Sequence, residues 1–110
     1  MIKAARELNR IVKESEEYER YQHAMKAVKE DAELYHSMNQ FRRRNYELQS
    51  YEDGVNRYQE IRDLCHEYEE VLRDPLVNEF LLAEQILVSK LQEVYNIIVD
   101  GLEFDYDYME

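Results

Sequence analysis

The sequence predicts an all-α protein: an antiparallel helical hairpin or bundle of about five helices that ends in one long helix. The 110 residues include only two glycines and one proline, too few for the frequent turns of an all-β chain. Apolar residues recur at three- and four-residue spacing, which is typical of amphipathic helices. A charged fraction of 35% suits the outer faces of such helices. The length fits one domain, which we expect over residues 1–102.

The first two helices are expected over residues 2–14 and from Ser15 onward. Ser15 can cap the second helix, because its hydroxyl accepts a backbone N–H and Glu16 and Glu17 then lie in the positively polarised first turn. The buried stripe of this helix has 3-4 spacing: Tyr18, Tyr21, Met25 and Val28. The pattern leaves open whether the two helices are separate or form one bent rod.

The third and fourth helices are expected to form the hairpin, over residues 32–50 and 55–72. Asp31 is the expected cap of the third helix, and the stretch from Ser50 to Gly54 is the most turn-like. The third helix has the seam Leu34, Met38, Phe41, Asn45 and Leu48. The fourth has the seam Tyr58, Ile61, Cys65, Tyr68 and Leu72. Two seams of similar length across a short turn predict an antiparallel pair.

The final helix is expected over residues 75–100, with Asp74 as its cap, Pro75 at its first position and Gly101 at its end. Its apolar arc is wide. One line contains Phe80, Leu87, Leu91, Val94 and Ile98, and a second contains Val77, Leu81, Val88, Tyr95, Val99 and Leu102. Such a helix must be covered on more than one side. We therefore expect a second copy or another protein to contact Leu81, Val88, Tyr95, Val99 and Leu102.

Two polar residues interrupt the apolar seams. Glu84 lies near the centre of the arc of the final helix, where a bare carboxylate is costly. We expect it to pair with an arginine, although the sequence does not select which one. Asn45 lies on the seam of the third helix, where a polar residue fixes register at some cost in stability.

A metal site is the alternative that the residues raise. Glu33 and His36 form a Glu-x-x-His, and Asp63 and His66 form an Asp-x-x-His; di-iron helical bundles use two Glu-x-x-His pairs that point inward. Here both pairs fall on the outer sides of their helices, so we expect solvated faces. Cys65 beside His66 suggests a nucleophile, but adjacent helical residues diverge by about 100° and cannot form a tight pair.

The charge disfavours nucleic acid as a partner. The net charge is −11, which repels a phosphate backbone unless a basic patch overrides it. The run Arg42–Arg44 fans around its helix and is expected to form surface ion pairs, with direct RNA binding as the lesser alternative. Residues 103–110 are acidic and rich in tyrosine, and we expect them to be disordered. With no signal peptide, no membrane span and one cysteine, a cytoplasmic protein is expected.

Several stretches, in their order and spacing, resemble the YlbF/YmcA family over residues 2–102. The resemblance lies in Leu48–Glu52 before the turn, in Pro75–Phe80 at the start of the final helix, and in Ala83-Glu84 followed by Leu91, Val94 and Ile98. Ser15–Tyr18 also resembles the start of the second helix in those proteins. No single one of these motifs is diagnostic.

The resemblance implies a helical, often dimeric, cytoplasmic bacterial protein without enzymatic activity of its own. Family members act as accessory factors in competence, sporulation and biofilm development, and some assemble with one another and with RNase Y to direct mRNA processing. Some also carry a cysteine-rich C-terminal tail linked to an iron–sulfur cluster. This chain departs there, because it has only Cys65 and ends in acidic and tyrosine residues. No cofactor is therefore predicted, and the departure leaves open whether RNase Y or another protein is the partner.

The sequence thus favours a non-catalytic regulatory or adaptor protein that works through protein–protein interaction. The expected partners are a second copy or related family members, with a ribonuclease as a further candidate. The alternative is a small metal-binding protein or enzyme that uses Glu33, His36, Asp63 and His66.

Overall fold

Capping residues set where the helices begin in the computed structural model, which describes residues 1–51 and 56–109. Helix α1 (Ile2–Lys13) is followed by α2 (Glu16–Lys29), which starts where the Ser15 hydroxyl accepts the Tyr18 N–H at 3.2 Å. Helices α1 and α2 are therefore separate, which settles the alternative that the sequence left open. The cap predicted at Ser15 is confirmed.

Two aspartates begin the other long helices. Helix α3 (Ala32–Gln49) begins where the Asp31 carboxylate accepts the Leu34 N–H at 3.1 Å. Helix α6 (Pro75–Val99) begins where the Asp74 carboxylate accepts the Leu76 N–H at 2.8 Å. It ends before Gly101, whose φ of +77° suits a residue without a side chain. Both predicted caps are confirmed.

The fourth predicted helix is divided in two, so the described residues contain six α-helices rather than five. Helix α4 (Tyr58–Glu67) and helix α5 (Glu69–Arg73) meet at Tyr68, whose φ of −102° and ψ of +23° interrupt the helix. The break places the Tyr68 ring 5.8 Å from the Phe41 ring. The predicted start at Val55 lies outside the described residues, as does the predicted turn at Gly54, and Arg57 precedes the first turn of α4.

The seam predicted for this region was also wrong by one position. Leu64, not Cys65, is the buried residue of α4, while Cys65 is partly buried and Tyr58 is exposed. The side that faces α3 runs through Ile61, Leu64 and Tyr68. Both Leu64 and Cys65 fit a 3-4 spacing between Ile61 and Tyr68, so the spacing alone could not tell which of the two is buried.

The core forms where α2, α3 and α6 meet, with α5 beside them. Its buried residues are Ala24, Val28, Met38, Val77, Phe80 and Ala83. Alanine on both α2 and α6 lets these two helix axes approach closely, because interaxial distance depends on the side chains at the contact. Tyr21 extends the contact, with its ring 5.4 Å from that of Phe80. The pairing of α2 with α6 was not predicted from the sequence.

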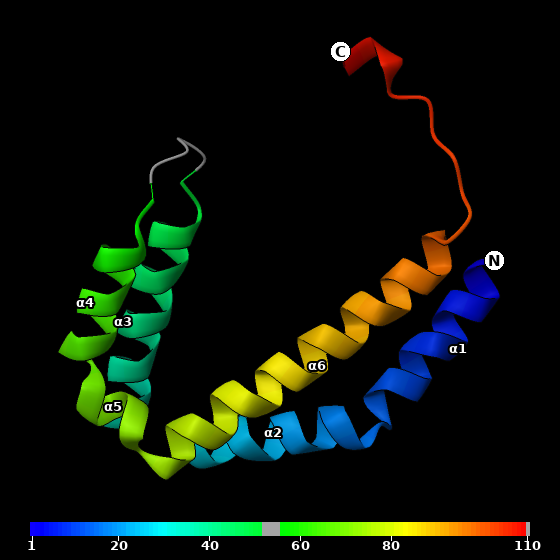
Figure 1. The fold of residues 1–110 in the computed structure, drawn as a ribbon. Coiled ribbons are helices and arrows are strands. Elements are labelled where there is room, and N and C mark those ends of the chain that lie inside the picture. The colour runs from blue at the N-terminus through cyan, green and yellow to red at the C-terminus, as the bar shows by residue number, and fades with distance from the viewer. Residues whose placement is uncertain (52–55, 110) are drawn as a thin grey trace.

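The molecule is an open V about 16 Å thick, with long dimensions of 46 and 40 Å. One arm contains α3, α4 and α5, with α3 and α4 side by side as the hairpin prediction required, and the other contains α2 and α6 (Figure 1). After α6 the chain continues without regular structure to a short 3-10 helix, η1 (Asp107–Met109). No helix in the described part of the chain is long and apolar enough to cross a bilayer. The domain bounds and the disorder predicted for residues 103–110 stay predictions.

Candidate functional site

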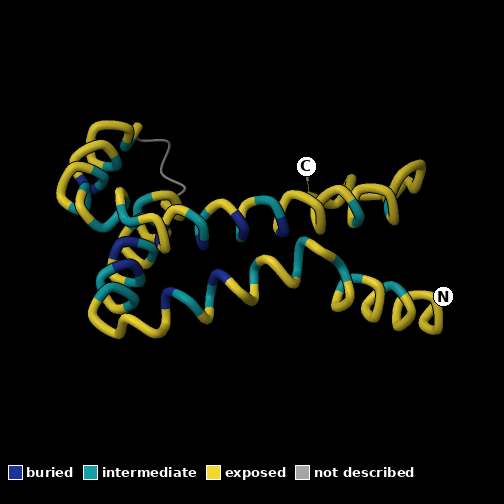
Figure 2. The backbone as a smooth tube through the Cα atoms, turned by 90° about the horizontal axis from the view of Figure 1, so that it is seen from below, coloured by how far each residue is buried: buried dark blue, intermediate teal, exposed yellow. Residues whose placement is uncertain are grey.

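Helix α6 is covered along its N-terminal half and open along its C-terminal half. Its buried residues are Val77, Phe80, Ala83 and Leu87, and beyond Leu87 none of its residues is buried. Figure 2 shows the same division along α6, where the buried positions lie only in the half that runs beside α2. The apolar arc nevertheless continues past this point, so the sequence supplies apolar residues that the fold of one chain does not cover.

We call the exposed apolar residues on this part of the arc the open face: Val88, Leu91, Tyr95, Ile98 and Leu102. Val88, Tyr95 and Ile98 are 56%, 58% and 59% exposed. Val94 and Val99 lie among them and are partly covered. Exposed apolar surfaces that exceed a few scattered residues are typical of interaction sites.

The contact residues predicted from the sequence divide between the core and the open face. Leu81 packs against the core cluster and is partly buried, so much of its surface is already used within the chain. Val88, Tyr95 and Leu102 are on the open face, and Val99 is partly covered beside them. Helix α1 runs on the same side of the molecule as this half of α6 (Figure 1) but contributes no buried residue.

The part of the open face that lies on α6 is electrically neutral within an acidic protein, whereas Leu102 lies beyond α6 between Asp100 and Glu103. From residue 85 to residue 99 the only charged residues are Lys90 and Glu93, and these two lie 3.9 Å apart as an ion pair. A chain of net charge −11 repels a second acidic chain at long range. A surface without excess charge is where two such chains can approach with the least repulsion.

Glu84 lies at the boundary between the covered and the open half of α6. Its carboxylate is 2.5 Å from Nη2 of Arg42 on α3, and the two side chains are 30% and 35% exposed. The Arg42 guanidinium also lies over the Phe80 ring, 4.9 Å from its centre, and donates to the Asn39 side chain at 3.1 Å. The structure thus identifies Arg42 as the partner of Glu84 and places the pair at the edge of the core, not inside it.

Asn45 is partly buried, and among the residues that the structure describes it contacts no buried polar partner. Its Oδ1 accepts a hydrogen bond from Nε2 of Gln49, one turn further along α3, at 2.9 Å. Because this hydrogen bond lies within α3, it does not fix how a neighbouring helix is aligned against α3. Whether Asn45 sets the register of α3 stays a prediction.

The three consecutive arginines of α3 each pair with a different acid. Arg42 contacts Glu84 on α6, Arg43 contacts Glu47 within α3, and Arg44 contacts Glu67 on α4. The three side chains point in different directions, as the helical spacing requires. Arg42 and Arg44 connect α3 to α6 and α4, and the three arginines do not form one basic patch.

A further ion pair joins α2 to α6 near the start of their contact. Arg20 donates to both carboxylate oxygens of Glu79, at 2.6 and 3.1 Å. The hydrogen bonds from Arg20 lower the pKa of the Glu79 carboxyl, because they favour its charged form. This pair lies on the surface and closes the edge of the core.

The residues of the metal alternative are not brought together. Glu33, His36, Asp63 and His66 are all exposed. Asp63 accepts a hydrogen bond from Gln59, and His66 lies 3.7 Å from Glu69, in each case within one or two turns of the chain. Over residues 1–51 and 56–109, no three His, Cys, Asp or Glu side chains are grouped so that they could hold a metal ion.

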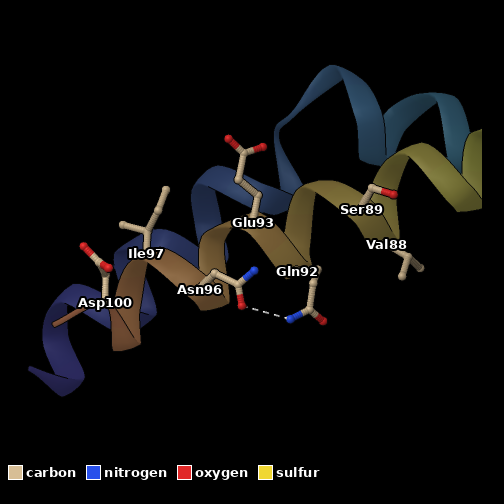
Figure 3. A pocket seen from close by; sticks show the side chains of 7 residues that line it. All are labelled: Val88, Ser89, Gln92, Glu93, Asn96, Ile97 and Asp100. Atoms are coloured by element: carbon tan, nitrogen blue, oxygen red, sulfur yellow. Dashed lines mark hydrogen bonds between the residues drawn. The ribbon is translucent and has the colours of Figure 1, made fainter. Parts of the chain in front are cut away.

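A depression on the outer side of α6 has a different character (Figure 3). Its lining residues are Val88, Ser89, Gln92, Glu93, Asn96, Ile97 and Asp100. Gln92 donates to Asn96 across it at 3.1 Å. Because all seven residues belong to α6 or its cap, the depression has only one wall and does not enclose a small molecule as a typical ligand pocket does.

Comparison with known proteins gives a family for these features. A family model described as "Control of competence regulator ComK, YlbF/YmcA" matches residues 1–103. A UPF0342 protein of Symbiobacterium thermophilum is 31% identical over 110 residues, which cover 98% of each chain. A UPF0342 protein of Caldicellulosiruptor bescii is 27% identical over 104 residues, which cover 91% of this chain and 86% of the relative. No solved structure matches.

Proposed function

Because the chain belongs to the YlbF/YmcA family of control factors for the competence regulator ComK, we propose that it is a non-catalytic regulatory protein. It acts in the cytoplasm by binding other protein chains through the open face of α6. The observation that supports this proposal is that the apolar arc of α6 continues for about three turns beyond the last buried residue, Leu87.

The first occupant we propose for the open face is another chain of the same kind, either a second copy or a related family member. Apart from Leu102, the face lies on one helix, and the charges of residues 85–99 balance, so two such faces can pack along each other as an antiparallel pair. Burial of five apolar side chains from each chain supplies a large driving force, at about 25 cal/mol per Å² of apolar area. In this way each chain provides the cover that the other lacks.

The second partner we propose is RNase Y, which the assembled family proteins would direct in mRNA processing. The acidic charge supports a protein rather than an RNA contact for this chain. In this arrangement the ribonuclease supplies the catalysis and the RNA binding, while the helical chain changes where it acts.

The self-association is tested by analytical ultracentrifugation of the wild-type chain and of Tyr95→Glu. We expect a wild-type dimer and a largely monomeric variant, because a carboxylate in an apolar contact must be desolvated. Leu82→Glu is the matched control, since Leu82 is an exposed apolar residue on the far side of α6, and we expect it to leave the dimer intact. A wild-type monomer at tens of micromolar would contradict this part of the proposal.

The ribonuclease partnership needs its own experiment. Purified RNase Y and the related family proteins of the same organism are mixed with this chain and separated by gel filtration, with Tyr95→Glu in parallel. We expect co-elution with the wild-type chain and its loss with the variant. Co-elution that persists with the variant would show that another surface binds the ribonuclease.

A further inference from the structure

Helix α1 has a basic side and an apolar side, and neither is part of the open face of α6. Within this acidic chain it contains four basic residues and one acid. The basic residues are Lys3, Arg6, Arg10 and Lys13, and their spacing of three, four and three places them within one stripe. At about 100° per residue, this stripe lies opposite the apolar side that contains Leu8 and Val12.

Most of this basic stripe has no acidic partner within the described residues. Arg10 contacts Glu7 and Glu14. No acid contacts Lys3, Arg6 or Lys13 in the part of the chain that the structure describes. Helix α1 also buries none of its residues. Its charged side is open to a partner. Its apolar side is only partly open, because Ile2 and Ile11 are exposed whereas Leu8 and Val12 are half-buried.

The C-terminal tail has the complementary pattern. From residue 103 to residue 108, acids at odd positions alternate with aromatic residues at even positions. In an extended chain this alternation places the acids on one side and the rings on the other. The structure shows the rings in a row, with centroids 6.1 Å apart for Phe104 and Tyr106 and 6.4 Å apart for Tyr106 and Tyr108.

The two patterns also agree in length. Ten residues of helix separate Lys3 from Lys13, a rise of about 15 Å. Four residues separate Glu103 from Asp107, and they span about 13 Å once the segment is extended. Full extension requires the start of η1 at Asp107 to open on docking. The acids of the tail can therefore follow the basic stripe from one end to the other. Asp105 accepts the Asp107 N–H at 2.9 Å, which leaves its charge and its second oxygen available.

We propose that the acidic tail of one chain docks along α1 of a second copy. The tail lies along the border between the basic stripe and the apolar side of α1. This border is formed by Ile2, Ala5 and Asn9 and contains no acidic residue. In this position the acids of the tail reach Lys3, Arg6 and Lys13, and its rings reach the apolar side. The tail of the same chain leads away from α1 (Figure 1), so a second copy supplies the contact. This inference rests on the self-association proposed above and adds a second contact to it.

The experiment exchanges the charges between two variants. The first variant carries Lys3→Glu, Arg6→Glu and Lys13→Glu, and the second carries Glu103→Lys, Asp105→Lys and Asp107→Lys. In a homodimer of either variant, the tail and α1 carry the same charge and repel each other. We expect the dissociation constant of this dimer to rise about tenfold or more, because each exposed ion pair contributes little but several are lost together. Mixed in equal amounts, the two variants restore opposite charges at both contacts. Native mass spectrometry should then show the heterodimer in large excess over both homodimers.

The controls separate the outcomes. A variant with Lys26→Glu, Lys29→Glu and Arg43→Glu reverses three charges outside α1, and its dimer should be as strong as the wild type. Circular dichroism confirms that each variant is helical. Weakened homodimers without recovery on mixing would mean that each tail binds its own α1, which overturns the proposal. A wild-type dimer that none of the charge variants weakens would also overturn it while leaving the open face standing, whereas a wild-type monomer would remove both.

Discussion

Nη2 of Arg42 lies 2.5 Å from Oε2 of Glu84, and this ion pair joins α3 to α6 at the point where the covered half of α6 ends. The guanidinium lies at the same time over the ring of Phe80, a fully buried residue. One arginine therefore neutralises the acid within the apolar arc and covers the edge of the core. The open face begins directly beyond it.

This relationship is tested by a double-mutant cycle with Arg42→Ala, Glu84→Ala and the double variant. Both side chains are about one-third exposed, so solvent screens the pair, and we expect a coupling energy of about 0.5–1 kcal/mol. The free energy of unfolding is measured by urea titration. Arg42→Lys should recover only part of the stability, because an ammonium does not stack on the Phe80 ring as a guanidinium does. Additive effects of the two single changes would contradict the pairing.

Close packing of α2 on α6 gives a second prediction. Ala83 is 1% exposed within the core cluster, so Ala83→Leu should force the two helices apart and lower the free energy of unfolding by about 1–3 kcal/mol. Ala4→Leu is the control, because Ala4 is exposed on α1, and it should have little effect. Thermal unfolding followed by circular dichroism measures both. An equally stable Ala83→Leu would show that α2 and α6 are not in close contact.

The pair between Arg20 and Glu79 predicts a pH dependence. The pKa of Glu79 is lowered in the folded chain by its hydrogen bonds to Arg20. A lowered pKa means that the pair stabilises the fold above the unfolded-state value of about 4.3 and that this stability is lost as the pH falls through the folded-state pKa. Wild type should thus have a higher Tm than Glu79→Gln at pH 7, and the difference should shrink as the pH falls and vanish once Glu79 is protonated in the folded chain as well. Arg20→Gln should give the same result, and a difference that is constant with pH would contradict the assignment.

The sequence by itself determined the helices and their caps. Ser15, Asp31 and Asp74 begin helices because their side chains accept backbone N–H groups within the next few residues. Apolar spacing identified Met38, Phe41, Phe80 and Leu87 as residues of the buried side. The wide arc of α6 likewise predicted that one chain would leave it partly open. All these features depend on residues close together in the chain.

The sequence predicted the pair of α3 and α4, but only the tertiary structure decided that α2 packs on α6 and where the cover of α6 stops. The apolar spacing within α6 shows which side of the helix is buried, but it does not show that α2 covers the first half of that side. The same spacing would fit any neighbouring helix. Nor could it select Arg42 from the arginines available to Glu84, since that choice depends on how α3 lies against α6. The break at Tyr68 and the choice of Leu64 over Cys65 as the buried residue of α4 were hidden for the same reason. Contacts between residues distant in the chain are set by how the helices pack together, and the local sequence pattern does not contain that information.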